Sequence, residues 1–140
     1  MKTGEFAYWD GTIDAKFDKK RPLKGIVVVE DDCHAFALHP ELIKDMDWYD
    51  GKKECEERFA TMPSLRQCKA IYDNKGVLNK SLVAAGFASI DDEAIWSSTE
   101  FSSYDAWKLR MSDGGRGAYD KFDDSYDVRP VRFLGVREAM

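Results

Sequence analysis

The sequence predicts a single α+β domain, residues 1–140, in which antiparallel strands flank two or three helices in the middle of the chain. Residues 26–29 form a continuous β-branched run, which is typical of a strand buried on both faces. Apolar residues recur at helical spacing between residues 47 and 86, and from residue 95 the apolar period is two, as in half-buried strands. Strands, then helices, then strands, with no repeating βαβ unit, indicate the α+β class.

The first third of the chain predicts short strands and one buried hairpin. Residues 1–24 mix glycine, proline and scattered aromatic residues, so we expect short edge strands and turns. The runs 25–29 and 33–38 are separated by the acidic turn 30–32. This spacing predicts a hairpin in the core sheet.

Three helices are expected in the middle of the chain. Asp47 suits the N-cap of the first, an amphipathic helix whose apolar face runs to Phe59. Ser64 and Gln67 have the spacing of a capping box, in which each side chain satisfies a backbone donor at the start of a helix. The third helix is expected to end before Gly86, because a glycine there can adopt the left-handed C-cap conformation.

The last third predicts strands joined by polar turns. Residues 106–111 alternate between apolar and polar side chains and lead into the turn 113–115, which indicates a hairpin. Residues 117–122 and 126–133 predict two more strands, separated by the polar turn 123–125.

Composition excludes several classes of partner. The chain carries 26 acidic and 21 basic residues, with a net charge of −5, and no basic cluster that would bind a run of phosphates. We therefore expect no nucleic-acid partner. No apolar run approaches a membrane-spanning length or a signal-peptide core, so membrane insertion is not expected. The three cysteines are widely spaced and odd in number, which favours buried thiols over a disulfide framework.

An ordered set of motifs in the last third resembles the C-terminal signature of bacterial and phage C-type-lectin-like domains. The set comprises Ile95-Trp96-Ser97-Ser98-Thr99-Glu100, Ala106-Trp107, Ser112-Asp113-Gly114 and Val128-Arg129-Pro130-Val131-Arg132. Trp48, near the start of a helix, and residues 62–64, before a second helix, match the upstream part of that family's sequence pattern. Its members include C-terminal domains of adhesins and lipoproteins of unknown function, and retroelement-diversified display proteins.

The resemblance implies a C-type-lectin-like fold, a ligand-binding role and an extracellular or cell-surface setting, although a cytoplasmic one stays open. It also implies that the loops between residues 100 and 127 lie on one face. The calcium-ligating triplets of animal C-type lectins are missing, so a calcium-dependent sugar site of that kind is not expected. The formylglycine-generating enzymes, which are catalytic relatives, need a cysteine pair near their C-terminus, and here no cysteine follows Cys68.

The candidate ligand-binding residues lie in or beside these loops. Exposed aromatic rings and charged groups carried on a rigid scaffold are typical of recognition surfaces. The candidates are Glu100, Phe101, Tyr104, Asp105, Trp107, Arg110, Arg116, Tyr119 and Asp120. A core role is the alternative for Trp96 and Trp107, and a solvated hairpin is the alternative for Arg110 and Arg116.

Two further patterns are interpreted as structural. Arg129 and Arg132 flank Pro130, and we expect them to pair with interior carboxylates and hold the last strand. The carboxylates Asp120, Asp123, Asp124 and Asp127 could bind calcium weakly, but their spacing matches no calcium loop. No cofactor and no structural metal are therefore expected.

Three functions are compatible with these patterns. The favoured one is a non-enzymatic module that presents residues 100–127 to a glycan or a protein. The second is an enzyme with a dispersed acidic site built from Glu100, Asp105 and Asp120. The third is a structural or assembly domain in which the same face contacts another copy.

Overall fold

Two five-stranded sheets carry the fold, and the computed structural model describes them through residues 1–136. The first sheet has the order β10-β4-β3-β1-β2 and contains β1 (Phe6–Tyr8), β2 (Ile13–Asp14), β3 (Leu23–Val29), β4 (His34–Leu38) and β10 (Val131–Val136). The second has the order β5-β9-β6-β7-β8 and contains β5 (Ile43–Met46), β6 (Ala94–Glu100), β7 (Asp105–Arg110), β8 (Arg116–Asp120) and β9 (Tyr126–Val128). The helices lie between β5 and β6 in the chain, which confirms the predicted α+β class.

The predicted hairpin of the first sheet is β3–β4, with Val28 opposite Phe36. Its strands approach closely at Gly25, where an added Cβ would lie 2.6 Å from the carbonyl oxygen of Leu38. Only glycine fits this contact without displacement of the backbone. The β-branched run is buried on both faces, as its composition predicts.

Three helices connect the sheets: α1 (Trp48–Glu57), α2 (Leu65–Asp73) and α3 (Lys75–Ala84). Asp47 caps α1 by accepting a hydrogen bond from the backbone N–H of Asp50 at 2.8 Å. The capping box at α2 is also confirmed. Ser64 Oγ accepts from the N–H of Gln67 at 3.1 Å, and Gln67 Oε1 accepts from the N–H of Ser64 at 2.9 Å. Gly86 follows α3 with a φ of +84°, as expected for a left-handed residue.

The expectation that Phe59 extends the apolar face of α1 is wrong. The helix ends at Glu57, and Phe59 takes a left-handed φ of +53° that turns its ring into solvent. The buried face of α1 consists of Trp48, Gly51 and Cys55.

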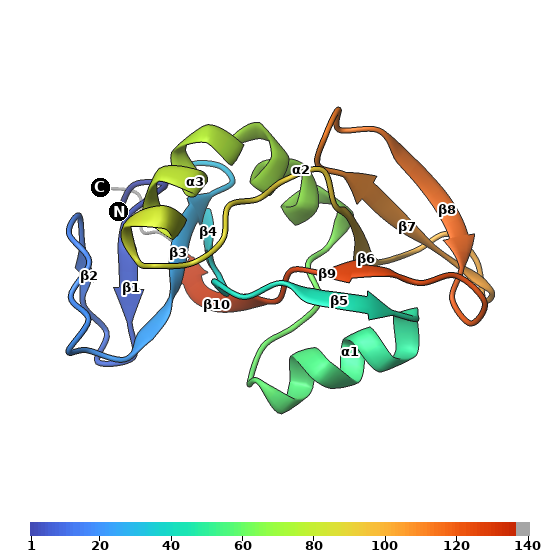
Figure 1. Ribbon diagram of the computed structural model, residues 1–140, viewed down its shortest axis with the longest axis horizontal. Coiled ribbons are helices and arrows are strands. Elements are labelled where there is room, and N and C mark those ends of the chain that lie inside the picture. The colour runs from blue at the N-terminus through green and yellow to red at the C-terminus, as the bar shows by residue number, and fades with distance from the viewer. Residues whose placement is uncertain (137–140) are drawn as a thin grey trace.

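The predicted strand 126–133 is two strands in different sheets. β9 pairs with β5 in the second sheet, whereas β10 pairs with β4 in the first. Pro130 lies between them and has no N–H to donate to a ladder, so the chain leaves one sheet there and joins the other. This crossing links the two halves of the molecule (Figure 1).

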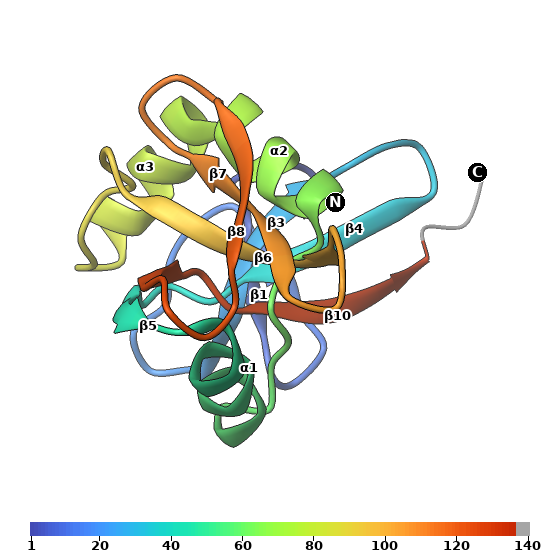
Figure 2. The same cartoon turned by 90° about the vertical axis from the view of Figure 1, so that its right-hand side faces the viewer.

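Two hydrophobic clusters fill the interior. The larger lies between the first sheet, α2, α3 and the side chains of Ile95 and Leu109. The smaller surrounds Trp48 and Trp96. Figures 1 and 2 show α2 and α3 on one side of the molecule and α1 on the opposite side. None of the helices described in residues 1–136 has the length and apolarity needed to cross a bilayer.

Candidate binding surface

Three chain segments meet at the end of the second sheet that lies away from the first sheet (Figure 1). They are the loop between β6 and β7, the loop between β8 and β9, and the start of α1. The backbone N–H of Lys121 donates to the carbonyl of Tyr104 at 2.9 Å, and the N–H of Trp48 donates to the carbonyl of Lys121 at 3.0 Å. Lys121 therefore joins all three segments through its main chain alone.

The side chain of Lys121 strengthens the same junction. Its Nζ donates to Glu100 Oε1 at 2.7 Å and to the carbonyls of Ser102 and Ser103, each at 3.1 Å. The ammonium also lies 4.6 Å from the centre of the Trp48 ring, within range of a cation–π contact. Lys121 is only 2% exposed. The hydrogen bond from Lys121 lowers the pKa of Glu100 below its usual value, which favours the ionised form of this carboxylate.

Around this junction lie three aromatic side chains that are exposed to solvent. Tyr104 and Phe122 are each 76% exposed. Tyr49 is also exposed, and its ring centre is 5.4 Å from that of Phe122. We call Tyr49, Tyr104 and Phe122 the aromatic edge. Sequence reasoning singled out Tyr104 but missed the other two, since Tyr49 opens a helix and Phe122 was assigned to a strand.

Phe101, Trp107 and Arg116 form a second group. The rings of Phe101 and Trp107 pack edge to face with centres 5.4 Å apart, and the guanidinium of Arg116 lies 5.6 Å from the Trp107 ring. Next to Arg116 is a groove of about 530 Å³ between α2 and β7, lined by Leu65, Arg66, Lys69, Leu109, Gly114 and Arg116. Trp107 is half-buried, so it both packs and contributes surface.

Tyr119 belongs to the opposite face of the same sheet. It lies in β8 opposite Ala106, and Ala106 belongs to the cluster around Trp96. Because successive residues of a strand point to opposite faces, Ala106 and Trp107 face apart. Tyr119 packs on Tyr126 with ring centres 5.4 Å apart, and Lys108 Nζ lies 4.5 and 4.4 Å from those two rings. The structure thus separates Tyr119 from Phe101 and Trp107.

The remaining candidates take part in local turns. Arg110 donates to both carboxylate oxygens of Asp113, at 3.1 and 3.0 Å, in an exposed pair. Asp120 Oδ1 accepts from the N–H groups of Phe122 and Asp123 at 2.8 and 2.9 Å, and these bonds lower its pKa. The carbonyl of Asp105 accepts from Phe101 at 2.9 Å.

The acidic candidates show little of what acid–base chemistry needs. A carboxyl group that acts as a general acid at neutral pH needs a pKa raised above its usual value. The pKa values of Glu100 and Asp120 are instead both lowered. Within residues 1–136, no three side chains of His, Cys, Asp or Glu are grouped closely enough to hold a metal ion.

The motif Ile95–Glu100 positions the site from inside the molecule. Trp96 is fully buried and its Nε1 donates to the carbonyl of Met46 at 2.9 Å. The carbonyl of Ser97 accepts from Trp48 Nε1 at 2.8 Å. Thr99 Oγ1 accepts from the N–H of Leu65 at 2.9 Å. These contacts tie β6 to β5, α1 and α2, which supports the core interpretation of Trp96.

Comparison with known proteins does not assign the chain to a family. A scan against models of protein families finds no match, and a search of curated proteins finds none either.

Proposed function

We propose that the chain is a non-enzymatic binding domain of the C-type-lectin-like type that holds a glycan or a protein at the aromatic edge. The observation that carries the proposal is the placement of three exposed aromatic rings around the buried Lys121 junction. Exposed rings that gather from separate segments are typical of interaction sites. The sequence motifs favour the same class, and with it a cell-surface setting.

Rigidity of the underlying scaffold supports a recognition role. Lys121 donates hydrogen bonds to Glu100 and to two loop carbonyls, and these bonds restrain the loop between β6 and β7 before a ligand binds. A surface that is ordered beforehand binds with a smaller entropy cost. The aromatic rings supply flat apolar area, and the serine and aspartate side chains around them supply hydrogen-bonding groups.

The orientation of the candidates decides which of them belong to the proposed site. Tyr104, Phe122 and Tyr49 form its centre, and Glu100 contributes through Lys121. Phe101, Trp107 and Arg116 flank it as a row of contacts that runs from the loop between β6 and β7 across β7 to the start of β8. Tyr119 lies on the other face of the sheet and is assigned to packing.

A glycan array with matched variants tests the proposal. The edge variant is Tyr104→Ala with Phe122→Ala, and the control variant is Phe59→Ala with Phe133→Ala, which removes two equally exposed rings elsewhere. We expect the wild type and the control to bind the same glycans and the edge variant to lose them. Repeating the array with chelator tests a role for calcium.

Two results would overturn the proposal. Binding that survives in the edge variant would place the site elsewhere, and turnover of a bound substrate would make the chain an enzyme. If no glycan on the array binds the wild type, a display library of peptides and small domains is screened instead, with the same two variants. A protein ligand that depends on the aromatic edge supports the proposal equally.

A further inference from the structure

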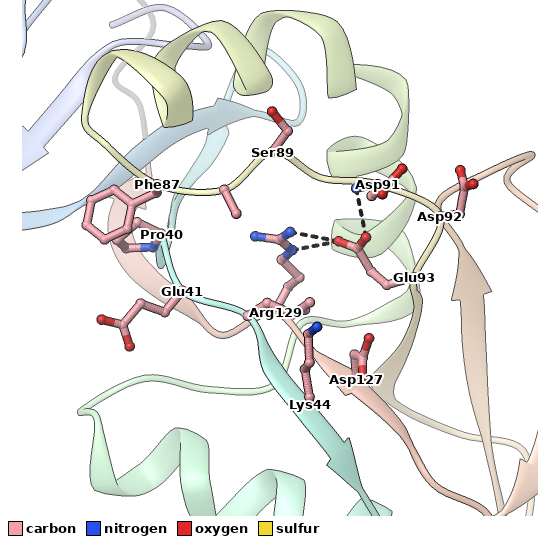
Figure 3. A pocket seen from close by; sticks show the side chains of 12 residues that line it. Pro40, Glu41, Lys44, Phe87, Ser89, Asp91, Asp92, Glu93, Asp127 and Arg129 are labelled. Carbon is pink, nitrogen blue, oxygen red and sulfur yellow. Dashed lines mark hydrogen bonds and ion pairs between the residues drawn. The ribbon is translucent and has the colours of Figure 1, made fainter.

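A second cavity lies on a different part of the molecule from the aromatic edge. It has a volume of about 680 Å³ and is bordered by the segment between β4 and β5, the segment between α3 and β6, and the end of β9 with the following Arg129 (Figure 3). Known small-molecule sites fall within this range of size. The walls include Leu42 and Phe87, which give the cavity an apolar side.

Arg129 forms the floor of this cavity and has one unused donor. Its Nε and Nη2 donate to Glu93 Oε1 at 3.0 and 2.7 Å. The residue is 1% exposed, and its Nη1 has no hydrogen-bond partner among the described residues. Figure 3 shows the guanidinium at the centre of the cavity, with the third nitrogen turned away from Glu93. A buried N–H group without an acceptor is costly, so an oxygen acceptor from a bound molecule would satisfy it.

The other charges around the cavity are mainly negative. Lining carboxylates come from Glu41, Asp91, Asp92, Glu93 and Asp127, against the two cations Lys44 and Arg129. Arg129 is engaged by Glu93, and of the remaining lining carboxylates Glu41, Asp91 and Asp92 are exposed to solvent, whereas Asp127 is half-buried; Lys44 is the other lining cation. Burial raises the pKa of Asp127, and the neighbouring charges of Asp45 and Glu93 add to the shift. Such an environment repels anions and favours a cationic group.

We propose that this cavity binds a small ligand that carries an ammonium group and a hydroxyl or carbonyl oxygen. The ammonium pairs with Asp127 and its neighbouring carboxylates, and the oxygen accepts from Arg129 Nη1. The carbon skeleton packs on Phe87 and Leu42. Two sources present this chemistry: a free amino sugar, or a lysine side chain next to a peptide carbonyl.

Nuclear magnetic resonance titration of the ¹⁵N-labelled protein distinguishes recognition of the ligand's charge from recognition of its shape. The probes are D-glucosamine, N-acetyl-D-glucosamine and Nα-acetyl-L-lysine methylamide. The two sugars share a ring, but only glucosamine carries the ammonium. We expect glucosamine to shift the amide signals of residues 87–93 and 127–129, and to bind at least about tenfold more tightly than its acetylated form, because a charge-assisted hydrogen bond is lost.

The lysine probe identifies the source of the ligand. Tighter binding of the lysine derivative than of glucosamine indicates a peptide ligand, and the reverse order indicates an amino sugar. Equal shifts from both sugars, or no shift at residues 87–93 with either cationic probe, would overturn the proposal.

Two variants test which lining residues contribute to binding, and a third serves as the control. Asp127→Asn keeps the size of the side chain and removes its charge, and Arg129→Lys keeps a cation near Glu93 but removes Nη1. We expect each to weaken glucosamine binding about tenfold. Asp32→Asn is the control, because it removes one exposed charge in the turn between β3 and β4. If Arg129→Lys does not fold, unchanged binding in Asp127→Asn is still sufficient to reject the site.

The cavity and the aromatic edge can be tested separately. The variant that lacks Tyr104 and Phe122 should bind glucosamine as the wild type does. Loss of glucosamine binding in that variant would contradict two independent sites.

Discussion

Arg129 and Glu93 form a buried ion pair in which two guanidinium nitrogens share one carboxylate oxygen, at 2.7 and 3.0 Å. The pair joins the crossing between β9 and β10 to the segment that leads into β6. Glu93 also accepts from the backbone of Asp91 at 2.8 Å. The last strand is thus fastened to the middle of the chain through charges as well as through the sheet, as expected for Arg129.

Removal of Glu93 should be strongly destabilising. Glu93→Ala leaves the guanidinium of Arg129 buried without its partner, and breaking one side of a buried pair costs about 3–5 kcal/mol. The exposed pair Lys69–Asp73 is the control, since Lys69→Ala should change the free energy of unfolding by less than about 0.5 kcal/mol. Urea denaturation measures both, and similar losses in the two variants would contradict a buried role for Glu93.

Replacement of Lys121 should loosen the junction beneath the aromatic edge. Lys121→Met keeps the aliphatic stem but leaves the carbonyls of Ser102 and Ser103 without their donor, so we expect a loss of about 2–4 kcal/mol. Hydrogen exchange of residues 101–104 should accelerate as well. Lys53→Met, on the exposed side of α1, is the control. Unchanged stability in Lys121→Met would show that the loops do not depend on this ammonium.

His39 should make the fold sensitive to mild acid. Burial, followed by the charge of Arg132, lowers the pKa of His39 to about 4, whereas an unfolded histidine titrates near pH 6.5. The unfolded state therefore binds the proton first, and stability is lost as the pH falls from about 6.5 toward 4. Between pH 7 and pH 5 the loss from this group should be about 2 kcal/mol.

The His39→Asn variant isolates that contribution. The amide oxygen of asparagine can take the place of Nδ1, which accepts from the backbone of Glu41 at 3.1 Å. The variant should show a smaller drop in stability over the same pH range. Identical pH profiles for the wild type and the variant would assign the acid sensitivity to other groups.

The three thiols should differ sharply in reactivity. Burial raises the pKa of Cys55 to about 12 and raises that of Cys68 as well, whereas Cys33 is exposed. Only the thiolate reacts with a disulfide reagent, so Cys33 should be labelled rapidly in the native protein and the buried pair only after unfolding. Cys33→Ser should remove the rapid phase. The expectation of burial is thus confirmed for Cys55 and Cys68 and wrong for Cys33, which lies in the turn before β4.

Local sequence signals predicted the fold well wherever the structure depends on neighbouring residues. Ser64 and Gln67 of the capping box are three positions apart, and the side chains of β7 alternate every two residues. Both patterns are therefore visible in the sequence. The end of α1 was missed because it depends on a left-handed turn at Phe59, a residue type that usually avoids this conformation.

Features that depend on distant residues could not be predicted. Lys121 falls within the predicted strand 117–122, and nothing in its local sequence marks it as buried, yet its ammonium pairs with Glu100, 21 residues away, and lies over the ring of Trp48. The register of β7 and β8 places Tyr119 on the face opposite Trp107, and no local pattern gives that register. The cavity above Arg129 is made from three separate segments, so it exists only once the chain is folded.

The pairing of β10 with β4 has a consequence for the order in which the protein acquires its shape. β4 lies in the first third of the chain, but its second neighbour is the strand 131–136. During synthesis one side of β4 therefore stays uncovered until residues 131–136 have left the ribosome. Contacts between such distant segments slow folding. A nascent chain in which β3 and β4 have paired would thus expose an unpaired strand edge while the residues between β4 and β10 are synthesised, and a chaperone would matter most in that interval.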